Sequence, residues 1–147
     1  MPAAPVPPAV EEFLKQPNNC VIATLRPDGS PHTTATWYDW DGSRILVNLD
    51  EIRPRLKWMR HDGRVALTMV DPQNFYRHIS IMGRVAEIVD DPERVDIDRL
   101  SQRYVGKPYP RRKLPRVSVW IEVERWHGWD RSPNEPAGGI TRERLPL

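Results

Sequence analysis

The sequence has a single cysteine, Cys20, so no intrachain disulfide can form and nothing in its cysteine content indicates secretion. It also lacks any stretch that approaches the roughly 18 consecutive apolar residues that a membrane-spanning helix needs. Its first residues, MPAAPVPPAVEEF, have neither the basic start nor the continuous apolar core of a signal peptide. These absences predict a soluble, cytoplasmic protein with no membrane partner.

Excess charge of one sign is missing as well, because the formal net charge is only +2 over 147 residues. A dedicated nucleic-acid-binding protein needs a broad basic surface to neutralise backbone phosphates. The sequence therefore predicts no nucleic-acid partner. Its length predicts one domain with a single hydrophobic core.

The sequence contains no G-x-S-x-G elbow, no phosphate-binding P-loop and no G-x-G-x-x-G, so hydrolase, NTPase and Rossmann-type chemistry are not indicated. No two histidines have metal-ligand spacing, and Cys20 at the head of an apolar run is typical of a buried small hydrophobe; we therefore expect no metal site. Because no self-contained catalytic machinery is visible, an enzyme built from this chain would use a bound cofactor, and no catalytic residue is assigned. The histidines are His32, His61, His78 and His127.

The hydrophobic pattern predicts a mainly β (α+β) fold with six antiparallel strands and short flanking helices. Residues 1–9 are expected to be a flexible lead-in, residues 10–130 the folded domain and residues 131–147 an extended tail. A glycine inside the long fifth strand, Gly83, predicts a bulge or bend. The predicted strands are Cys20–Leu25, His32–Trp40, Ile45–Leu49, Val65–Val70, Tyr76–Val89 and Val117–Val123. The predicted helices run from Ala9 to Gln16, from Pro54 to Asp62-Gly63 and from Glu93 to Tyr104.

The helix that begins at Pro54 has an unusual concentration of cations at its start. Arg53, Arg55, Lys57 and Arg60 fall within eight residues, where unpaired backbone N–H groups and the helix dipole already favour an anion. Two interpretations are open. The cations bind a phosphate-bearing ligand, or they form the solvated basic face of an ordinary surface helix.

Aromatic residues cluster in two places. Trp37, Tyr38 and Trp40 lie on the second predicted strand, and Trp126 and Trp129 follow the last one. Strand alternation places Trp37 on the face opposite Tyr38 and Trp40. Core packing accounts for some of them, and the surplus favours the wall of a planar ligand site or a dimer interface.

The order of these parts resembles a known family. CVIATLRPDGSPHTTATWYDWDGSRILVNL, then RPRLKWMRHDGRVALTMVD, ISIMGRVAEIVDD and RVSVWIEVERWHGWD are similar to the pyridoxamine 5′-phosphate oxidase-like split β-barrels, and most of all to the flavin/deazaflavin oxidoreductases of the B group. The resemblance covers about residues 10–130. It implies a six-stranded split β-barrel with an FMN-binding-like fold.

The resemblance also implies a homodimer with two cofactor sites at the subunit interface. It assigns the cofactor phosphate to Arg53, Arg55 and Lys57. It implies that the partner subunit closes the site with segments around Tyr76 to His78 and Trp126 to Trp129, of which His78 and Trp126 are the named candidates. The residues that it places near the cofactor ring are Thr34, Ala35, Thr36, Trp37 and Tyr38, with Val47, Asn48 and Leu49.

The implied cofactor is the deazaflavin coenzyme F420 or, alternatively, FMN. F420 has an anionic lactyl-oligoglutamate tail, which would favour extra cations such as Arg60 or Arg111-Arg112-Lys113, and we therefore favour F420. The expected activity is hydride transfer between F420 and a small conjugated organic substrate. The alternatives are an FMN-dependent oxidase or reductase and a non-catalytic carrier of the same fold. Tyr38 and His78 are candidate proton donors, although a hydrogen-bonded structural role is favoured for each.

Overall fold

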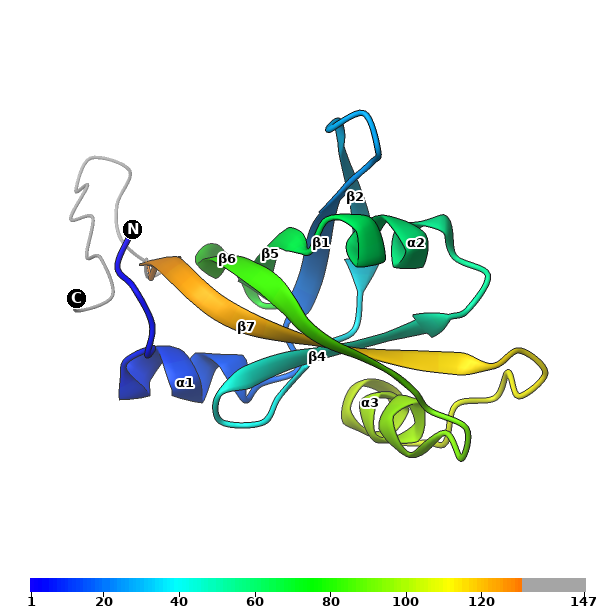
Figure 1. Ribbon diagram of the computed structural model, residues 1–147. Coiled ribbons are helices and arrows are strands. Elements are labelled where there is room, and N and C mark those ends of the chain that lie inside the picture. The colour runs from blue at the N-terminus through cyan, green and yellow to red at the C-terminus, as the bar shows by residue number, and fades with distance from the viewer. Residues whose placement is uncertain (131–147) are drawn as a thin grey trace.

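A computed structural model describes residues 1–130 of the chain; the predicted tail at 131–147 lies outside them (Figure 1). None of the helices within residues 1–130 has the length and apolar character needed to cross a bilayer. The helices are α1 (Pro8–Leu14), α2 (Pro54–His61) and α3 (Val95–Val105). The strands are β1 (Asn19–Leu25), β2 (Pro31–Thr36), β3 (Asp39–Trp40), β4 (Arg44–Asp50), β5 (Arg64–Asp71), β6 (Asn74–Asp90) and β7 (Arg116–Trp129).

All seven strands form one antiparallel sheet in the order β2-β1-β5-β6-β7-β4-β3. The edge strands β2 and β3 are joined by only Trp37 and Tyr38, so the two edges of the sheet lie close together although it does not close. The predicted mainly β split barrel is confirmed, with seven strands rather than six. The extra strand arises because the run predicted as His32–Trp40 breaks at Trp37-Tyr38 into β2 and β3.

The predicted bend at Gly83 is confirmed. The pairing of β6 with β7 shifts register between Met82 and Gly83. A Cβ added to Gly83 would lie 2.7 Å from the backbone oxygen of Glu122 and 2.8 Å from a methyl carbon of Ile121. Only glycine therefore permits this close approach of the two strands.

The prediction that the last strand ends at Val123 is wrong, because β7 continues to Trp129. Its second half pairs with the first half of β6, with Trp126 opposite Ile81 and Trp129 opposite His78. This long-range pairing extends the strand through a segment that the local pattern did not mark. Trp126 and Trp129 consequently lie on β7 rather than beyond it.

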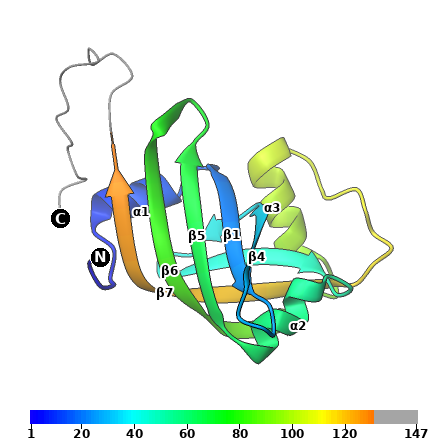
Figure 2. The same ribbon diagram turned by 90° about the horizontal axis from the view of Figure 1, so that it is seen from above.

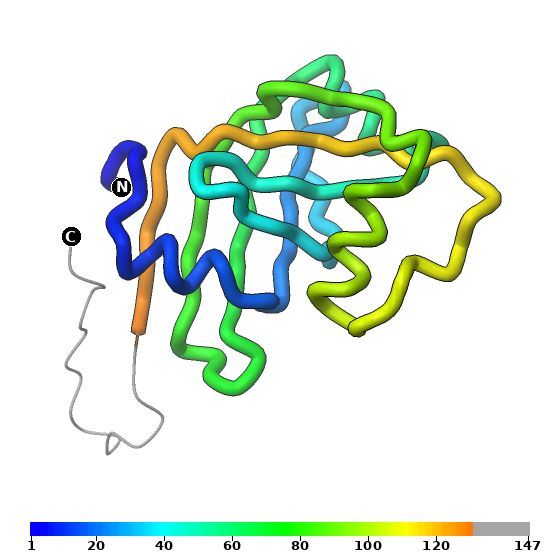
Figure 3. Tube along the Cα trace, turned by 90° about the horizontal axis from the view of Figure 1, so that it is seen from below, coloured from blue at the N-terminus to red at the C-terminus, as the bar shows by residue number. Residues whose placement is uncertain are grey.

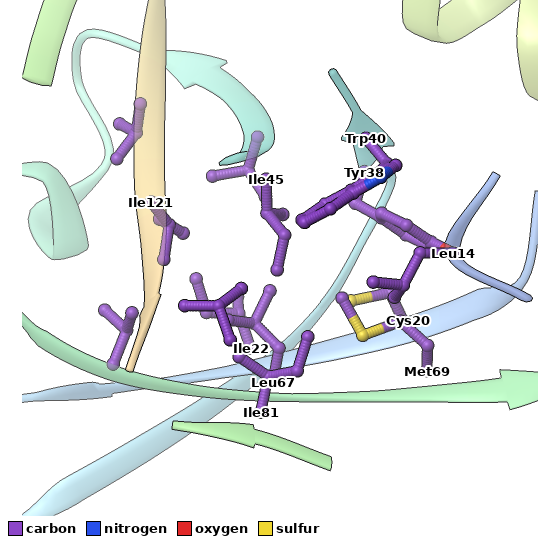
Figure 4. Close-up of a cluster of buried hydrophobic side chains, with 14 of the residues drawn as sticks. Leu14, Cys20, Ile22, Tyr38, Trp40, Ile45, Leu67, Met69, Ile81 and Ile121 are labelled. Atoms are coloured by element: carbon purple, nitrogen blue, oxygen red, sulfur yellow. The ribbon is translucent and has the colours of Figure 1, made fainter. Parts of the chain in front are cut away.

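The core lies between the two halves of the bent sheet. Figure 2 shows β1, β5 and β6 side by side, with β4 and the first half of β7 running across them. Inward-facing Ile22, Leu67 and Ile81 from the first group pack in one cluster with Ile45 and Ile121 from the second (Figure 4). Alternate burial along β1 and β5 is the signature of strands with one face on the core.

The N-terminal residues are attached to the sheet. Ala4 N–H donates to Glu124 and Trp126 N–H donates to Pro2, with Ala3 bridged to Arg125, so this stretch lies along the second half of β7 (Figures 2 and 3). The segment expected to be a flexible lead-in over residues 1–9 is thus held by backbone hydrogen bonds and includes the start of α1.

Helix α3 lies below β4 and the first half of β7 in the view of Figure 1. It begins at Val95, two residues later than predicted, because Arg94 takes a left-handed conformation and the buried Asp91 carboxylate accepts from the N–H groups of Asp96 and Ile97. Near its other end, Arg103 donates to the carbonyl oxygens of Leu14, Lys15 and Gln16, which ties α3 to the end of α1.

Candidate functional site

A cavity of about 570 Å³ opens where β1, β2, β4, β5 and α3 meet. Its walls are mostly apolar or aromatic, with a few polar groups at one side, as in most small-molecule sites. The lining residues are Asn19, Cys20, Val21, Ala35, Thr36, Trp37, Asn48, Thr68, Val70, Ile97, Leu100, Tyr104, Tyr109 and Arg116.

The polar side of the cavity is built on Asn48 and Arg116, both buried. Arg116 Nε donates to Asn48 Oδ1 at 2.9 Å, and its Nη1 donates to Asp50 Oδ1 at 2.5 Å. Asn48 Nδ2 in turn donates to Asp91 Oδ2 at 3.1 Å and Ser118 Oγ at 3.0 Å. A satisfied buried network of this kind fixes the orientation of each member.

Next to this network lies a cluster of arginines with too little negative charge to balance it. Asp50 pairs with both Arg53 and Arg116, at 3.3 and 2.5 Å. Arg55 is half-buried and has no ion-pair partner among residues 1–130. Burial, together with the nearby charges of Arg53 and Arg116, lowers the pKa of Arg55 below its usual value. The start of α2 therefore holds a cation that an anionic ligand would stabilise.

Aromatic rings form the wall next to this polar side. The Trp37 ring stacks on Tyr104, with centroids 5.5 Å apart and an interplanar angle of 8°. Tyr109 meets Trp37 edge-on at 6.2 Å, and the Arg116 guanidinium lies 4.8 Å over the Tyr109 ring. The cavity thus joins several aromatic rings to a cationic group, which suits a ligand that has both an aromatic part and an anionic group.

Four of the residues predicted near the cofactor ring line this cavity: Ala35, Thr36, Trp37 and Asn48. Arg53, Arg55 and Lys57, predicted for the phosphate, surround the start of α2. The charge of Arg55 interacts with that of Arg116, which lines the cavity. Lys57 is exposed and makes no ion pair within residues 1–130. The cavity is therefore lined by residues of β2 and β4 but by none of the three cations at the start of α2.

Other predicted residues lie elsewhere. Val47, Leu49, Tyr38 and Trp126 are buried in the core, at 3%, 2%, 0% and 2% exposure, so their side chains do not reach the cavity. The Tyr38 hydroxyl donates to Gln16 O at 2.9 Å and accepts from Asn18 Nδ2 at 3.0 Å. Burial raises the pKa of Tyr38 to about 12. This hydroxyl is committed to the fold and is a poor proton donor to a ligand.

Two more predicted residues flank the cavity without lining it. Thr34 on β2 contacts His32, with 3.5 Å between Thr34 Oγ1 and His32 Nδ1. His78 on β6 pairs across the sheet with Val70, which does line the cavity, and it is half-buried. Neither contributes to the walls seen in one copy of the chain.

Sequence reasoning did not assign to the site the lining residues of β1 and β5, nor those of α3 and the segment after it. Tyr104, Tyr109 and Arg116 line the cavity, as do Ile97 and Leu100 of α3. No local signal distinguished Arg116 from Arg111 or Arg112 in the basic segment. Only the pairing of β7 with β4, which sets Ser118 opposite Asn48, brings it to the site.

Within residues 1–130, no three His, Cys, Asp or Glu side chains gather as a metal ion would need. Cys20 lines the inner end of the cavity and is buried, and burial raises the pKa of its thiol to about 12. A thiol held protonated in this way is a weak nucleophile. Binding, rather than covalent chemistry, is therefore what the cavity residues are suited to provide.

Comparison with known proteins agrees with this geometry. Residues 6–130 match the family described as pyridoxamine 5′-phosphate oxidase. The chain is 30% identical over 117 residues to an F420H(2)-dependent biliverdin reductase from Mycobacterium tuberculosis, covering 77% of this chain and 80% of that protein. It is similar to a solved F420 reductase structure (TM-score 0.73, 31% identity, 82% of this chain and 98% of that one). It is also similar to a conserved hypothetical protein from Mycobacterium tuberculosis (TM-score 0.70, 29% identity, 95% and 96%).

Proposed function

The chain belongs to the pyridoxamine 5′-phosphate oxidase family, and from that premise we propose that it is an F420-dependent oxidoreductase acting on a small conjugated organic substrate. The observation that carries the proposal is the half-buried Arg55, which has no ion-pair partner within residues 1–130 and lies near Arg53 and Arg116, of which Arg116 lines the cavity. A phosphate at this point would supply the negative charge that the cluster lacks.

The residues fit such a cofactor at both ends. Arg53, Arg55 and Lys57 would hold the phosphate, and Ala35, Thr36 and Asn48 would lie along the ring. FMN has the same phosphate, so the arginine cluster alone does not separate the two cofactors. The relatives named for F420 favour F420, as does Arg60, an exposed further cation on α2.

When bound and reduced, F420 supplies a hydride from the C5 carbon of its ring to an electrophilic carbon of the substrate. The chain positions the two partners and keeps water from the reacting faces. Neither a carboxylate nor an imidazole lines the cavity in the described residues, and the Tyr38 hydroxyl is already bonded. The proposal therefore has the accompanying proton come from solvent.

A second copy of the chain would complete the site. The middle of the outer face of β2, β1, β5 and β6 carries uncharged side chains in facing rows, among them Thr33, Ala23, Ala66 and Met82, and the next row on β5 and β6 holds Arg64 and Arg84. Val21 and Met82 on this face are 43% and 49% exposed. Several cavity residues lie on the same face, so the cavity is open toward it. We propose that a homodimer covers this face and closes both cavities.

We expect Ala66→Glu to convert the dimer to a monomer, because it places a charge in the middle of the proposed interface without touching the cavity lining. Size-exclusion chromatography with light scattering measures the mass directly. Val95→Glu, on the exposed start of α3, is the matched control and should leave the mass unchanged. An unchanged mass in Ala66→Glu would exclude this face as the interface.

The proposed activity is tested by titrating the purified protein with F420 and FMN in parallel, followed by tryptophan fluorescence quenching. Selective F420 binding is expected. The second step follows oxidation of reduced F420 on addition of biliverdin, the substrate in the name of the relative that is 30% identical. Selective FMN binding would indicate a flavin enzyme, F420 binding without oxidation across a panel of conjugated acceptors would indicate a carrier, and binding of neither would refute the proposal.

A further inference from the structure

The segment from 106 to 115, between α3 and β7, brings one side chain to the cavity. Figure 3 shows this yellow segment extending away from the body of the protein after α3. Most of its residues are exposed, yet Tyr109 is half-buried and lines the cavity. An irregular loop that contributes a ring to a cavity wall needs its own anchor.

Asp98 on α3 provides that anchor. Its Oδ1 accepts from the backbone N–H of Tyr109 at 2.9 Å and from Arg112 Nη1 at 2.8 Å, and its Oδ2 accepts from Arg112 Nη2 at 3.1 Å. Arg112 Nη1 also donates to Tyr109 O at 3.0 Å, and Arg94 donates to the carbonyl oxygen of Arg112. The backbone N–H of Tyr109 is therefore held directly by the Asp98 carboxylate, and its carbonyl oxygen is held through Arg112. Arg112, expected as a candidate for the cofactor tail, is used here instead.

The ring of Tyr109 is also fixed from two sides. It contacts Trp37 edge-on at an angle of 86°, and Arg116 covers it at 4.8 Å. Trp37 is held in turn by stacking on Tyr104, whose hydroxyl donates to Asn18 O at 2.7 Å. Rings held in this way lose little conformational freedom when a ligand stacks on them, and so they make effective binding walls.

We infer that Trp37 and Tyr109 form the substrate wall of the cavity, where a flat, extended conjugated molecule stacks on one ring and meets the other edge-on, because the two rings stand at 86° to each other, and that the loop at 106–115 determines substrate selectivity. This inference rests on the proposed function. The cations proposed for the cofactor phosphate lie on α2, whereas Tyr109 comes from the loop and is fastened to α3. The two parts of the site therefore come from different segments of the chain, and Arg116 lies between them.

The test compares Tyr109→Ala with Tyr109→Phe, which keeps the ring, and with Leu114→Ala, a control in the same loop whose exposed side chain does not line the cavity. Isothermal titration calorimetry measures biliverdin binding to each variant, with and without oxidised F420, and F420 binding separately. We expect at least fivefold weaker biliverdin binding in Tyr109→Ala, F420 binding within twofold of the unmodified chain, and wild-type behaviour for the other two. A thermal melt of each variant checks that it is folded.

Each other result has a defined meaning. Biliverdin binding that is unchanged in Tyr109→Ala, or absent from the unmodified chain, would overturn the inference. An equal loss of F420 and biliverdin binding in Tyr109→Ala would also overturn it, since the ring would then serve the cofactor. Failure of the unmodified chain to bind F420 would refute the proposed function instead, and biliverdin binding without F420 would still test the wall.

Discussion

Replacing Arg55 and Lys57 together by alanine is expected to weaken F420 binding by at least tenfold without destabilising the protein. A charge-assisted contact to a phosphate contributes about 1.5–3 kcal/mol, which is lost with each cation that touches it. In the free protein, by contrast, Arg55 has no ion-pair partner within residues 1–130, and the repulsion from Arg53 and Arg116 outweighs the attraction of Asp50. Its removal should therefore leave the melting temperature unchanged or slightly raised.

The double variant is expected to lose affinity for F420 without losing stability, so it separates a binding role of these cations from a structural one. Fluorescence titration with F420 gives the affinity, and a thermal melt without ligand gives the stability. Lys15→Ala/Arg44→Ala removes the same two charges from pairs outside the cavity and controls for long-range electrostatics. F420 affinity equal to that of this control would show that the start of α2 is a solvated basic face with no role in binding.

Much of the fold follows from local patterns in the sequence. The turn at Asp28-Gly29, the helix start at Pro54 and the bend at Gly83 each depend on the conformational limits of one or two residues, and these limits hold wherever the residues occur. Such features can be predicted without knowing what packs against them. The end of β7 could not, because the first half of β6 extends it by pairing.

The break between β2 and β3 shows the same limit at the site. Trp37 and Tyr38 are neighbours in a run with good strand propensity, and alternation correctly separates their side chains. The residues that separate the two side chains lie outside this run. Trp37 stacks on Tyr104, 67 positions later, and the Tyr38 hydroxyl donates to the carbonyl oxygen of Gln16. The division of the two aromatics between cavity and core is a tertiary effect.

The cationic half of the site was visible because its residues are close in sequence, at positions 53 to 57. The other half was not, since Tyr109 and Arg116 reach the cavity through contacts with residues far from them in sequence: Asp98 for the loop, and Asn48 and Asp50 for the arginine. Sequence reasoning therefore named the cations of α2 and one ring of the aromatic wall, Trp37, and missed Tyr104, Tyr109 and Arg116.

Arg116→Leu is expected to cost about 3 kcal/mol of unfolding free energy, the lower end of the range for removing one partner of a buried ion pair. Arg116 is 6% exposed and donates to Asn48 Oδ1, Asn48 O and Asp50 Oδ1, so its loss leaves Asn48 acceptors unpaired in the interior. Asp50 keeps its pair with Arg53 and its side chain is 14% exposed, which limits the cost.

Urea unfolding at one fixed protein concentration measures this change, because dimerisation would make stability depend on concentration. Arg84→Ala breaks the exposed pair with Glu124 and should change stability by less than about 1 kcal/mol. Arg116→Lys should fall between the two, since a lysine keeps the charge but cannot donate to Asn48 and Asp50 at once with the fork of a guanidinium.

If Arg116→Leu were as stable as Arg84→Ala, the buried network would contribute nothing net to folding. In that case the hydrogen bonds of Arg116 would not offset the free energy needed to bury its charge in the free protein. A role in ligand binding would then be the explanation for a buried arginine at this position.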